Sequence, residues 1–101
     1  MYQRFVFAKL KSEWSTAEGI QQTIDAGLEV LPAIDQVQSC RAGRPVGEEA
    51  SRGWDLVFVL EFESEQDIDI YFACDAHQEF LKTTLGPRIE AKRVWNFRME
   101  G

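Results

Sequence analysis

Four segments of the chain have the pattern of β-strands, with hydrophobic and polar positions that alternate in the first and last and a run of apolar residues in the third. The predicted strands span residues 2–10, 37–44, 54–62 and 91–98. In the first strand Phe5 and Phe7 fall on one face, and the other face carries Arg4, Val6 and Ala8. The third strand is apolar on both faces, so both faces of the sheet are expected to be covered.

A helical period of apolar residues follows the first strand. Residues 15–18, Ser-Thr-Ala-Glu, have the pattern of a capping box with Ser15 at the N-cap. The apolar stripe after them consists of Ile20, Ile24, Leu28 and Leu31. Pro32 is expected to end or kink the helix, because a proline inside it would clash with the preceding turn. Further along, the Gly- and charge-rich residues 43–53 predict an exposed loop.

Two short helices are predicted between residues 64 and 85. Ser64, with Asp67 three residues on, has the spacing of an N-cap and its reciprocal partner. Asp75 and Gln78 repeat that spacing, so a second helix is expected to begin there.

The predicted order of elements is strand, helix, strand, strand, helix pair, strand, which is that of a ferredoxin-like β-α-β-β-α-β protomer of the α+β class. We expect residues 1–101 to form one domain. In such a fold the helices lie on one face of an antiparallel sheet and leave the other face bare. Here that bare face carries aromatic and aliphatic side chains, a patch that a monomer rarely exposes. A two-fold homodimer with sheet packed on sheet is therefore predicted, with a different partner chain as the alternative.

Composition and charge narrow the function classes. Hydrophobic residues make up 45% and charged residues 28% of the 101 residues, as in soluble globular domains. No apolar run could span a bilayer and no signal peptide opens the chain, so we expect a cytoplasmic protein without a membrane partner. The net charge of −6 argues against nucleic-acid binding, and the cluster of Arg88, Lys92 and Arg93 is interpreted as a solvated patch. Cys40 and Cys74 form no metal or redox motif, and we expect reduced thiols.

His77 is the single histidine and marks the place where chemistry is expected. It falls in the first turn of the last helix, on the face that carries Phe80 and Leu81. The positive potential of a helix N-terminus favours the neutral imidazole, which can accept a proton near pH 7. The phenol of Tyr71 is expected close by. The alternative interpretation is structural, with His77 capping or packing under the turn between the two helices.

Two segments carry a resemblance to a known family. They are Gly53-Trp54-Asp55-Leu56-Val57-Phe58-Val59-Leu60-Glu61-Phe62-Glu63-Ser64 and Asp75-Ala76-His77-Gln78. With them, nearly the whole chain resembles the stress-responsive A/B barrel (Dabb) family, whose members are ferredoxin-like protomers that form a dimeric α+β barrel. One branch of that family is similar to olivetolic acid cyclase, a plant polyketide cyclase that folds a linear poly-β-ketoacyl thioester by intramolecular aldol condensation. The resemblance implies that Tyr71 and His77 carry such chemistry here.

The chain departs from the family's pattern at three places. The usual His-Pro-x-His becomes Cys74-Asp75-Ala76-His77. Histidines of the cyclase on the first and third strands correspond to Arg4 and Leu56 in this sequence.

The remaining candidate residues are expected to bind a substrate. If its side chain enters the barrel, Arg4 would meet an anionic or carbonyl-rich ligand through charge-assisted contacts; otherwise it reaches solvent or pairs with an acidic neighbour. Asn96 could add an amide to the same cavity or serve as a hydrogen-bonding residue of the sheet. The apolar candidates are core by default and pocket walls if the interior has room; they are Val6, Ala8, Phe58, Phe80 and Leu81.

These residues predict a cofactor-independent cyclase without a metal, in which His77 is the general base and Tyr71 holds the base or the substrate carbonyl. The substrate would be a small hydrophobic or polyketide-like molecule. The alternative function is a non-catalytic, stress-responsive dimer that binds a hydrophobic metabolite. A haem or quinol enzyme fits less well, because the one histidine suits base chemistry better than axial ligation. The imidazole is expected to face a dry hollow roofed by the sheet of a second subunit.

Overall fold

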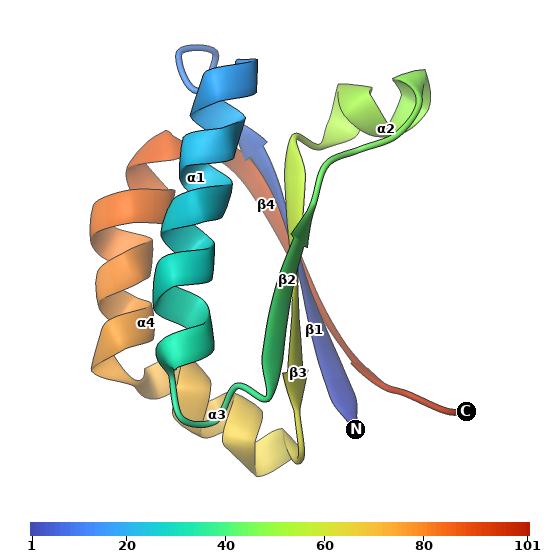
Figure 1. Ribbon diagram of the computed structural model, residues 1–101, viewed down its shortest axis with the longest axis vertical. Coiled ribbons are helices and arrows are strands. Elements are labelled where there is room, and N and C mark those ends of the chain that lie inside the picture. Colours follow the sequence, from blue (N-terminus) through green and yellow to red (C-terminus); the bar gives the residue numbers. More distant parts are fainter.

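Four strands form one antiparallel sheet in the computed structural model, which describes residues 1–101 (Figure 1). The strands are β1 (Tyr2–Leu10), β2 (Ser39–Gly43), β3 (Leu56–Phe62) and β4 (Ile89–Arg98), in the spatial order β2-β3-β1-β4. The two central strands, β3 and β1, pair with each other, and Val6 of β1 lies opposite Phe58 of β3 and Val94 of β4. The fold is ferredoxin-like, as the sequence predicts.

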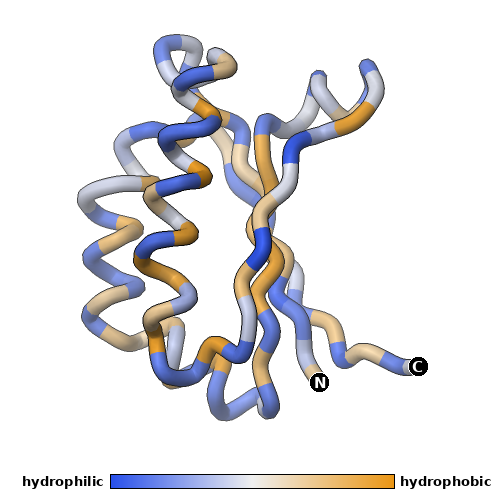
Figure 2. The backbone as a smooth tube through the Cα atoms, in the orientation of Figure 1, coloured by the Kyte–Doolittle hydropathy of each residue, from blue (hydrophilic) through white to orange (hydrophobic).

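Helices cover one face of this sheet. They are α1 (Ala17–Val30), α3 (Glu65–Ala73) and α4 (Asp75–Phe80), and α4 continues through one wide turn, Leu81–Leu85. In Figure 1 all three lie on the same side of the strands. Along β1 and β3 every second residue is buried against them, which is the alternation read from the sequence. Figure 2 shows hydrophobic positions recurring along the strands and α1, between which the core lies.

The opposite face of the sheet is bare, as expected. Trp95 and Phe97 of β4 are 55% and 52% exposed there. Phe97 packs edge-on against Phe5 of β1 with ring centroids 5.8 Å apart, and Val57 and Val59 of β3 are half-buried. These residues form an apolar surface that no helix of the chain covers.

Two predicted helix caps are wrong by one residue. The N-cap of α1 is Thr16, whose hydroxyl accepts a hydrogen bond from the Gly19 amide at 2.9 Å, and not Ser15. The N-cap of α4 is Cys74, so Asp75 is the first helical residue instead of the cap. In the first case Thr16 has the extended backbone that a cap requires, while the hydroxyl of Ser15 bonds Asp55.

Two further expectations about the helices are corrected. Residues 43–53 are not only a loop, because they include the helix α2 (Glu48–Gly53), which buries no residue and stands on the open side of the sheet (Figure 1). The apolar stripe of α1 is also narrower than predicted: Leu28 is 38% exposed, and Leu31 is buried in a short turn after the helix has ended. None of the helices combines the length and hydrophobicity that spanning a lipid bilayer requires.

Candidate active site

A small pocket lies between the helices and the inner face of the sheet, and it contains the predicted site. Its free volume is about 20 Å³, and its lining residues are Arg4, Val6, Leu31, Phe58, Tyr71, Phe72, His77, Phe80, Leu81, Leu85, Lys92 and Val94. They lie on the helix-covered side of the sheet, opposite to the bare face on which the sheet of a second subunit would pack. The expectation that a second subunit's sheet would roof the hollow is therefore wrong. The volume holds about one water-sized group.

The position of His77 follows from a break between two helices. Cys74 has extended backbone, which ends α3 and lets α4 begin at the next residue. The buried ring of His77 then lies 2.9 Å, measured from Nδ1, from the carbonyl oxygen of Phe72 at the end of α3. A carbonyl can only accept, so Nδ1 carries the hydrogen and donates it. The second nitrogen, Nε2, is thereby left unprotonated and without a partner in the chain.

Burial keeps the imidazole neutral. It is the largest cause that lowers the pKa of His77, and the charges of Arg4 and Lys92 lower it further against the opposing effect of the Phe72 carbonyl. A neutral ring with Nε2 as acceptor is the form that a general base needs.

Tyr71 of α3 places its phenol ring directly against that imidazole. The ring centroids of Tyr71 and His77 are 4.4 Å apart, and the other side of the phenol packs on Phe62 at 5.1 Å. No side-chain hydrogen bond within the chain involves the Tyr71 hydroxyl, although the residue as a whole is 1% exposed. Burial raises the pKa of Tyr71 strongly, so at neutral pH its hydroxyl is protonated and can donate.

Arg4 enters the interior and does not reach solvent or pair with an acid. It is 8% exposed, lines the pocket, and donates from Nη1 to Oδ1 of Asn96 on β4 at 3.1 Å. Burial lowers the pKa of Arg4, but a guanidinium keeps its charge in a protein. Lys92 lines the same pocket, and burial, followed by the charge of Arg4, lowers its pKa too.

The structure brings most of the predicted site residues together, with two exceptions. Ala8 is fully buried but does not line the pocket. Asn96 lines a neighbouring hollow of about 240 Å³, shared with Tyr2 and the start of α3, and reaches the His77 pocket only through its bond to Arg4. Val6, Phe58, Phe80 and Leu81 are pocket walls.

Several lining residues were missed, and one of them carried a usable signal. Lys92 was interpreted as part of a solvated patch. It is two residues before Val94 on β4 and lies opposite Ala8 of β1, so its side chain falls on the inner face of the sheet. Leu31, Phe72, Leu85 and Val94 are apolar residues of the helices and β4, and nothing in the sequence separates them from the rest of the core.

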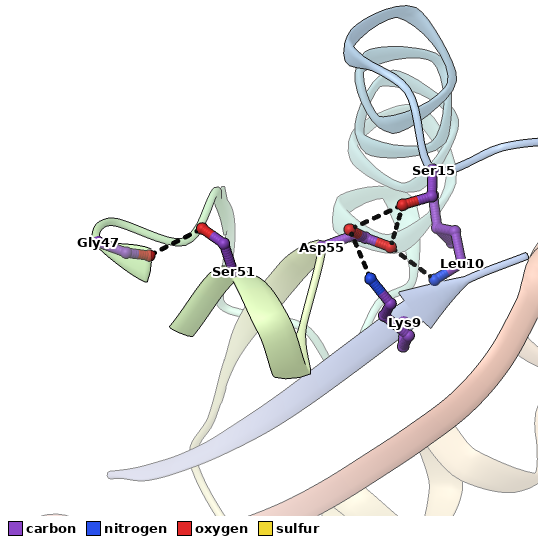
Figure 3. A network of polar contacts seen from close by, with 6 residues as sticks. All are labelled: Lys9, Leu10, Ser15, Gly47, Ser51 and Asp55. Atoms are coloured by element: carbon purple, nitrogen blue, oxygen red, sulfur yellow. Dashed lines mark hydrogen bonds and ion pairs between the residues drawn. The ribbon is translucent and has the colours of Figure 1, made fainter. Parts of the chain in front are cut away.

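A second polar cluster, around Asp55, lies at the far end of β1 (Figure 3). The buried carboxylate of Asp55 accepts hydrogen bonds from the Leu10 amide at 2.8 Å and the Ser15 hydroxyl at 3.1 Å. Lys9 Nζ lies 3.5 Å from it. These contacts join the end of β1, the segment before α1 and the start of β3, so the cluster is structural.

Several solved structures share this fold over nearly the whole chain. A Dabb family protein of Mesorhizobium loti has a TM-score of 0.84 at 18% identity, with 99% of this chain and 97% of that chain covered. A hydroxynitrile lyase of Passiflora edulis has a TM-score of 0.81 at 20% identity, covering 98% and 93% of the two chains. A dimeric ferredoxin-like protein of Thermobifida fusca has a TM-score of 0.79 at 17% identity, covering 97% and 90%. At these identities the likeness shows the fold alone.

Sequence comparison identifies the family. A comparison with curated protein sequences gives no match. The model of one protein family, described as the stress responsive A/B barrel domain, matches residues 3–97, which is almost the whole chain. The chain therefore belongs to the stress-responsive A/B barrel (Dabb) family.

Proposed function

We propose that the protein is a cofactor-independent enzyme in which His77 removes an acidic proton from carbon, and that it closes a ring in a polyketide-like chain by intramolecular aldol condensation. The observation that carries this proposal is the 2.9 Å hydrogen bond from Nδ1 of His77 to the Phe72 carbonyl. It leaves Nε2 as an unprotonated acceptor on a residue that lines the same pocket as Tyr71.

The reaction needs little beyond that base. A carbon between two carbonyls is acidic, and a positioned base speeds its deprotonation by about 10²- to 10⁴-fold. The proton goes to Nε2, and the electron pair of the enolate forms the new carbon–carbon bond to a carbonyl further along the chain, whose π bond breaks to leave an alkoxide. The imidazolium returns its proton to that alkoxide, and loss of water from the aldol completes the condensation. Tyr71, kept protonated by burial, donates a hydrogen bond to the oxygen on which charge develops.

The small volume of the pocket favours a second candidate, a non-catalytic dimer that binds a small metabolite. A free volume of about 20 Å³ is far less than a folded polyketide chain occupies. Ring closure in such a chain requires the walls to part at the open side, where Phe72 is half exposed and Leu81 half-buried. A ligand that inserts one end into the pocket requires no such movement.

Two of the similar structures support parts of the proposal. The Passiflora edulis protein is a hydroxynitrile lyase, so this fold can carry an enzyme. The Thermobifida fusca protein is described as dimeric, and the bare sheet face of the present chain suits the same assembly. We include a homodimer in the proposal, with the bare faces packed together and each His77 pocket inside its own subunit.

Hydrogen exchange at carbon tests the base. The methylene of ethyl acetoacetate is flanked by two carbonyls, and its exchange in D₂O can be followed by NMR. The wild-type protein should accelerate this exchange, and His77→Gln should lose about 10²-fold of the acceleration. Glu79→Gln is the matched control, because Glu79 is exposed on the same helix. If His77→Gln exchanges as fast as wild type while both bind the ester, the catalytic proposal is wrong and the binding protein remains.

A further inference from the structure

Two cations line the His77 pocket, and neither has a carboxylate partner. Arg4 lies on the inner face of β1, and Lys92 lies half-buried on the same face of β4. The ion pairs of the structure are Lys9–Asp55 and Arg52–Glu48, so Arg4 and Lys92 are both unpaired. No Asp or Glu is among the lining residues. This concentration of positive charge occurs in a chain whose net charge is −6.

The hydrogen bonds of Arg4 are also incomplete. Nη1 donates to the uncharged amide oxygen of Asn96, and Nε is buried without any partner. The guanidinium carbon lies 5.8 Å from the ring centroids of both Tyr71 and Phe72, and aromatic faces attract a cation without neutralising it. A guanidinium presents its donors as a fork that fits a carboxylate. The buried guanidinium of Arg4 therefore has a free donor, Nε, that an acceptor on a ligand could bind.

Burial of unpaired charge is unfavourable, and the two cations make it worse for each other. Burial, and then the charge of Arg4, lowers the pKa of Lys92. A bound anion would relieve the desolvation of Arg4, the repulsion between the two cations and the orphaned Nε together. No neutral ligand would do so.

We propose that the pocket binds the carboxylate of a small organic acid on Arg4 and Lys92, and that the substrate of His77 is therefore an anion of the β-keto acid class. The part that concerns His77 rests on the proposed function. A free volume of about 20 Å³ has room for about one oxygen of the carboxylate, and the rest of the molecule lies at the open side of the pocket by Phe72 and Leu81.

A matched pair of probes tests the charge requirement. Acetoacetate and acetylacetone have the same number of heavy atoms, and only the first is an anion at neutral pH. Isothermal titration in a buffer free of carboxylates and phosphate should show acetoacetate binding about tenfold or more tightly than acetylacetone, as expected for charge-assisted hydrogen bonds. Equal affinities for the two probes would overturn the proposal.

Substitutions on one strand provide the control. Lys92→Gln should weaken acetoacetate binding severalfold, whereas Arg93→Gln, one residue on and facing away from the pocket, should not change it. Arg4→Gln should lose about tenfold or more, and Arg4→Lys, which keeps the charge but not the fork, should recover part of this. Acetoacetate binding unchanged in both Arg4→Gln and Lys92→Gln would contradict the assignment.

The same variants separate this inference from the catalytic one. His77→Gln should still bind acetoacetate although it no longer accelerates exchange. If wild-type protein exchanges the ester but does not prefer the anion, the anion site is wrong and the base remains. If it binds the anion but exchanges nothing, the anion site remains and the base is wrong.

Discussion

The rings of His77 and Tyr71 pack against each other with centroids 4.4 Å apart and an angle of 41° between their planes. The two residues belong to different helices, α4 and α3, which are separated by the extended backbone of Cys74 at φ −69° and ψ 152°. Tyr71 and His77 are six positions apart, which is well over one and a half turns of an α-helix. In a continuous helix their side chains would therefore point in different directions. The break therefore brings a proton acceptor and a proton donor to the same wall of a buried pocket.

The pKa of His77 should lie below its ordinary value of 6.5. Burial disfavours the imidazolium, and Arg4 and Lys92 repel it, which together outweigh the Phe72 carbonyl. Tyr71, the other titratable group against the ring, is neutral in this range. An NMR titration of the ring nitrogens measures the pKa directly. A measured pKa above that of free imidazole would mean that His77 is largely protonated in the unliganded protein, which would contradict its role as a base.

Protonation of His77 should also destabilise the fold. Since its pKa is lower in the folded than in the unfolded chain, the unfolded chain binds more protons, and stability falls as the pH drops below about 6.5. The loss is complete once the pH is below the folded-state pKa. His77→Gln should flatten this part of the profile when urea midpoints are compared between about pH 7.5 and pH 5. Lys82→Gln, exposed on the following turn, should leave the slope unchanged.

Removal of the Tyr71 hydroxyl should affect exchange more than folding. Tyr71→Phe keeps the ring contacts with His77 and Phe62, and the lost hydroxyl has no hydrogen-bond partner in the chain. The melting temperature should therefore stay near that of wild type, while the acceleration of ethyl acetoacetate exchange falls by about 10²-fold. A large drop in melting temperature with exchange intact would assign Tyr71 to the core alone.

The fold could be predicted from the sequence because hydrophobic positions follow the periods of strands and helices, as in β1, where every second residue is buried. The third strand, β3, was indicated by a run of apolar residues. Arg4 falls on the same face as Val6 and Ala8, but the sequence left open whether its guanidinium points inward or reaches solvent. The helix α2 was missed because its residues, Glu-Glu-Ala-Ser-Arg-Gly, have no apolar stripe and bury nothing. No local sequence pattern therefore indicated the helix α2.

The details of the site depend on distant contacts that no local pattern contains. Ser15 and Thr16 are equally good caps by residue type, and the choice is made by Asp55, which occupies the hydroxyl of Ser15 from forty residues away. The volume of the pocket depends on side-chain rotamers around Phe58 and Phe72. The two-residue spacing from Lys92 to Val94 could have assigned Lys92 to the inner face of the sheet. Its neighbours Arg88 and Arg93 suggested a surface cluster instead.

Loss of the Asp55 carboxylate should destabilise the fold. Asp55→Ala leaves the buried Leu10 amide without its acceptor and the Ser15 hydroxyl without its partner, which should cost about 1–3 kcal/mol. Urea denaturation measures the change in the free energy of unfolding. Glu48→Ala is the control, because its pair with Arg52 is exposed and should contribute less than about 0.5 kcal/mol. Equal effects of the two substitutions would contradict the structural role of the Asp55 cluster.

Gly27 allows α1 to approach the sheet over the pocket. A Cβ at this position would collide with the ring of Phe58, a pocket wall in the centre of β3. Gly27→Ala should therefore destabilise the fold by about 1–3 kcal/mol through overpacking, although alanine favours a helix. Gly53→Ala, where an added Cβ meets nothing, should be close to neutral. A stabilised Gly27→Ala protein would show that helix propensity outweighs the packing at this contact.

A charge on the bare sheet face should prevent dimerisation. Trp95 is 55% exposed on β4, on the same face as Phe97 and part of the apolar surface that the proposed homodimer buries. Trp95→Asp would place a carboxylate in that interface, where its desolvation is not compensated, so sedimentation velocity should show a monomer where wild type is a dimer. Leu28→Asp is the control, because Leu28 is exposed on α1, on the helix side of the sheet.

The monomer made in this way should keep its chemistry. The His77 pocket lies on the face of the sheet opposite to Trp95, so Trp95→Asp should accelerate ester exchange as wild type does, provided that it stays folded. A folded monomer without exchange would show that the second subunit contributes to the site after all. Wild-type protein that sediments as a monomer would contradict the proposed homodimer and leave a different partner chain as the alternative cover for the aromatic face.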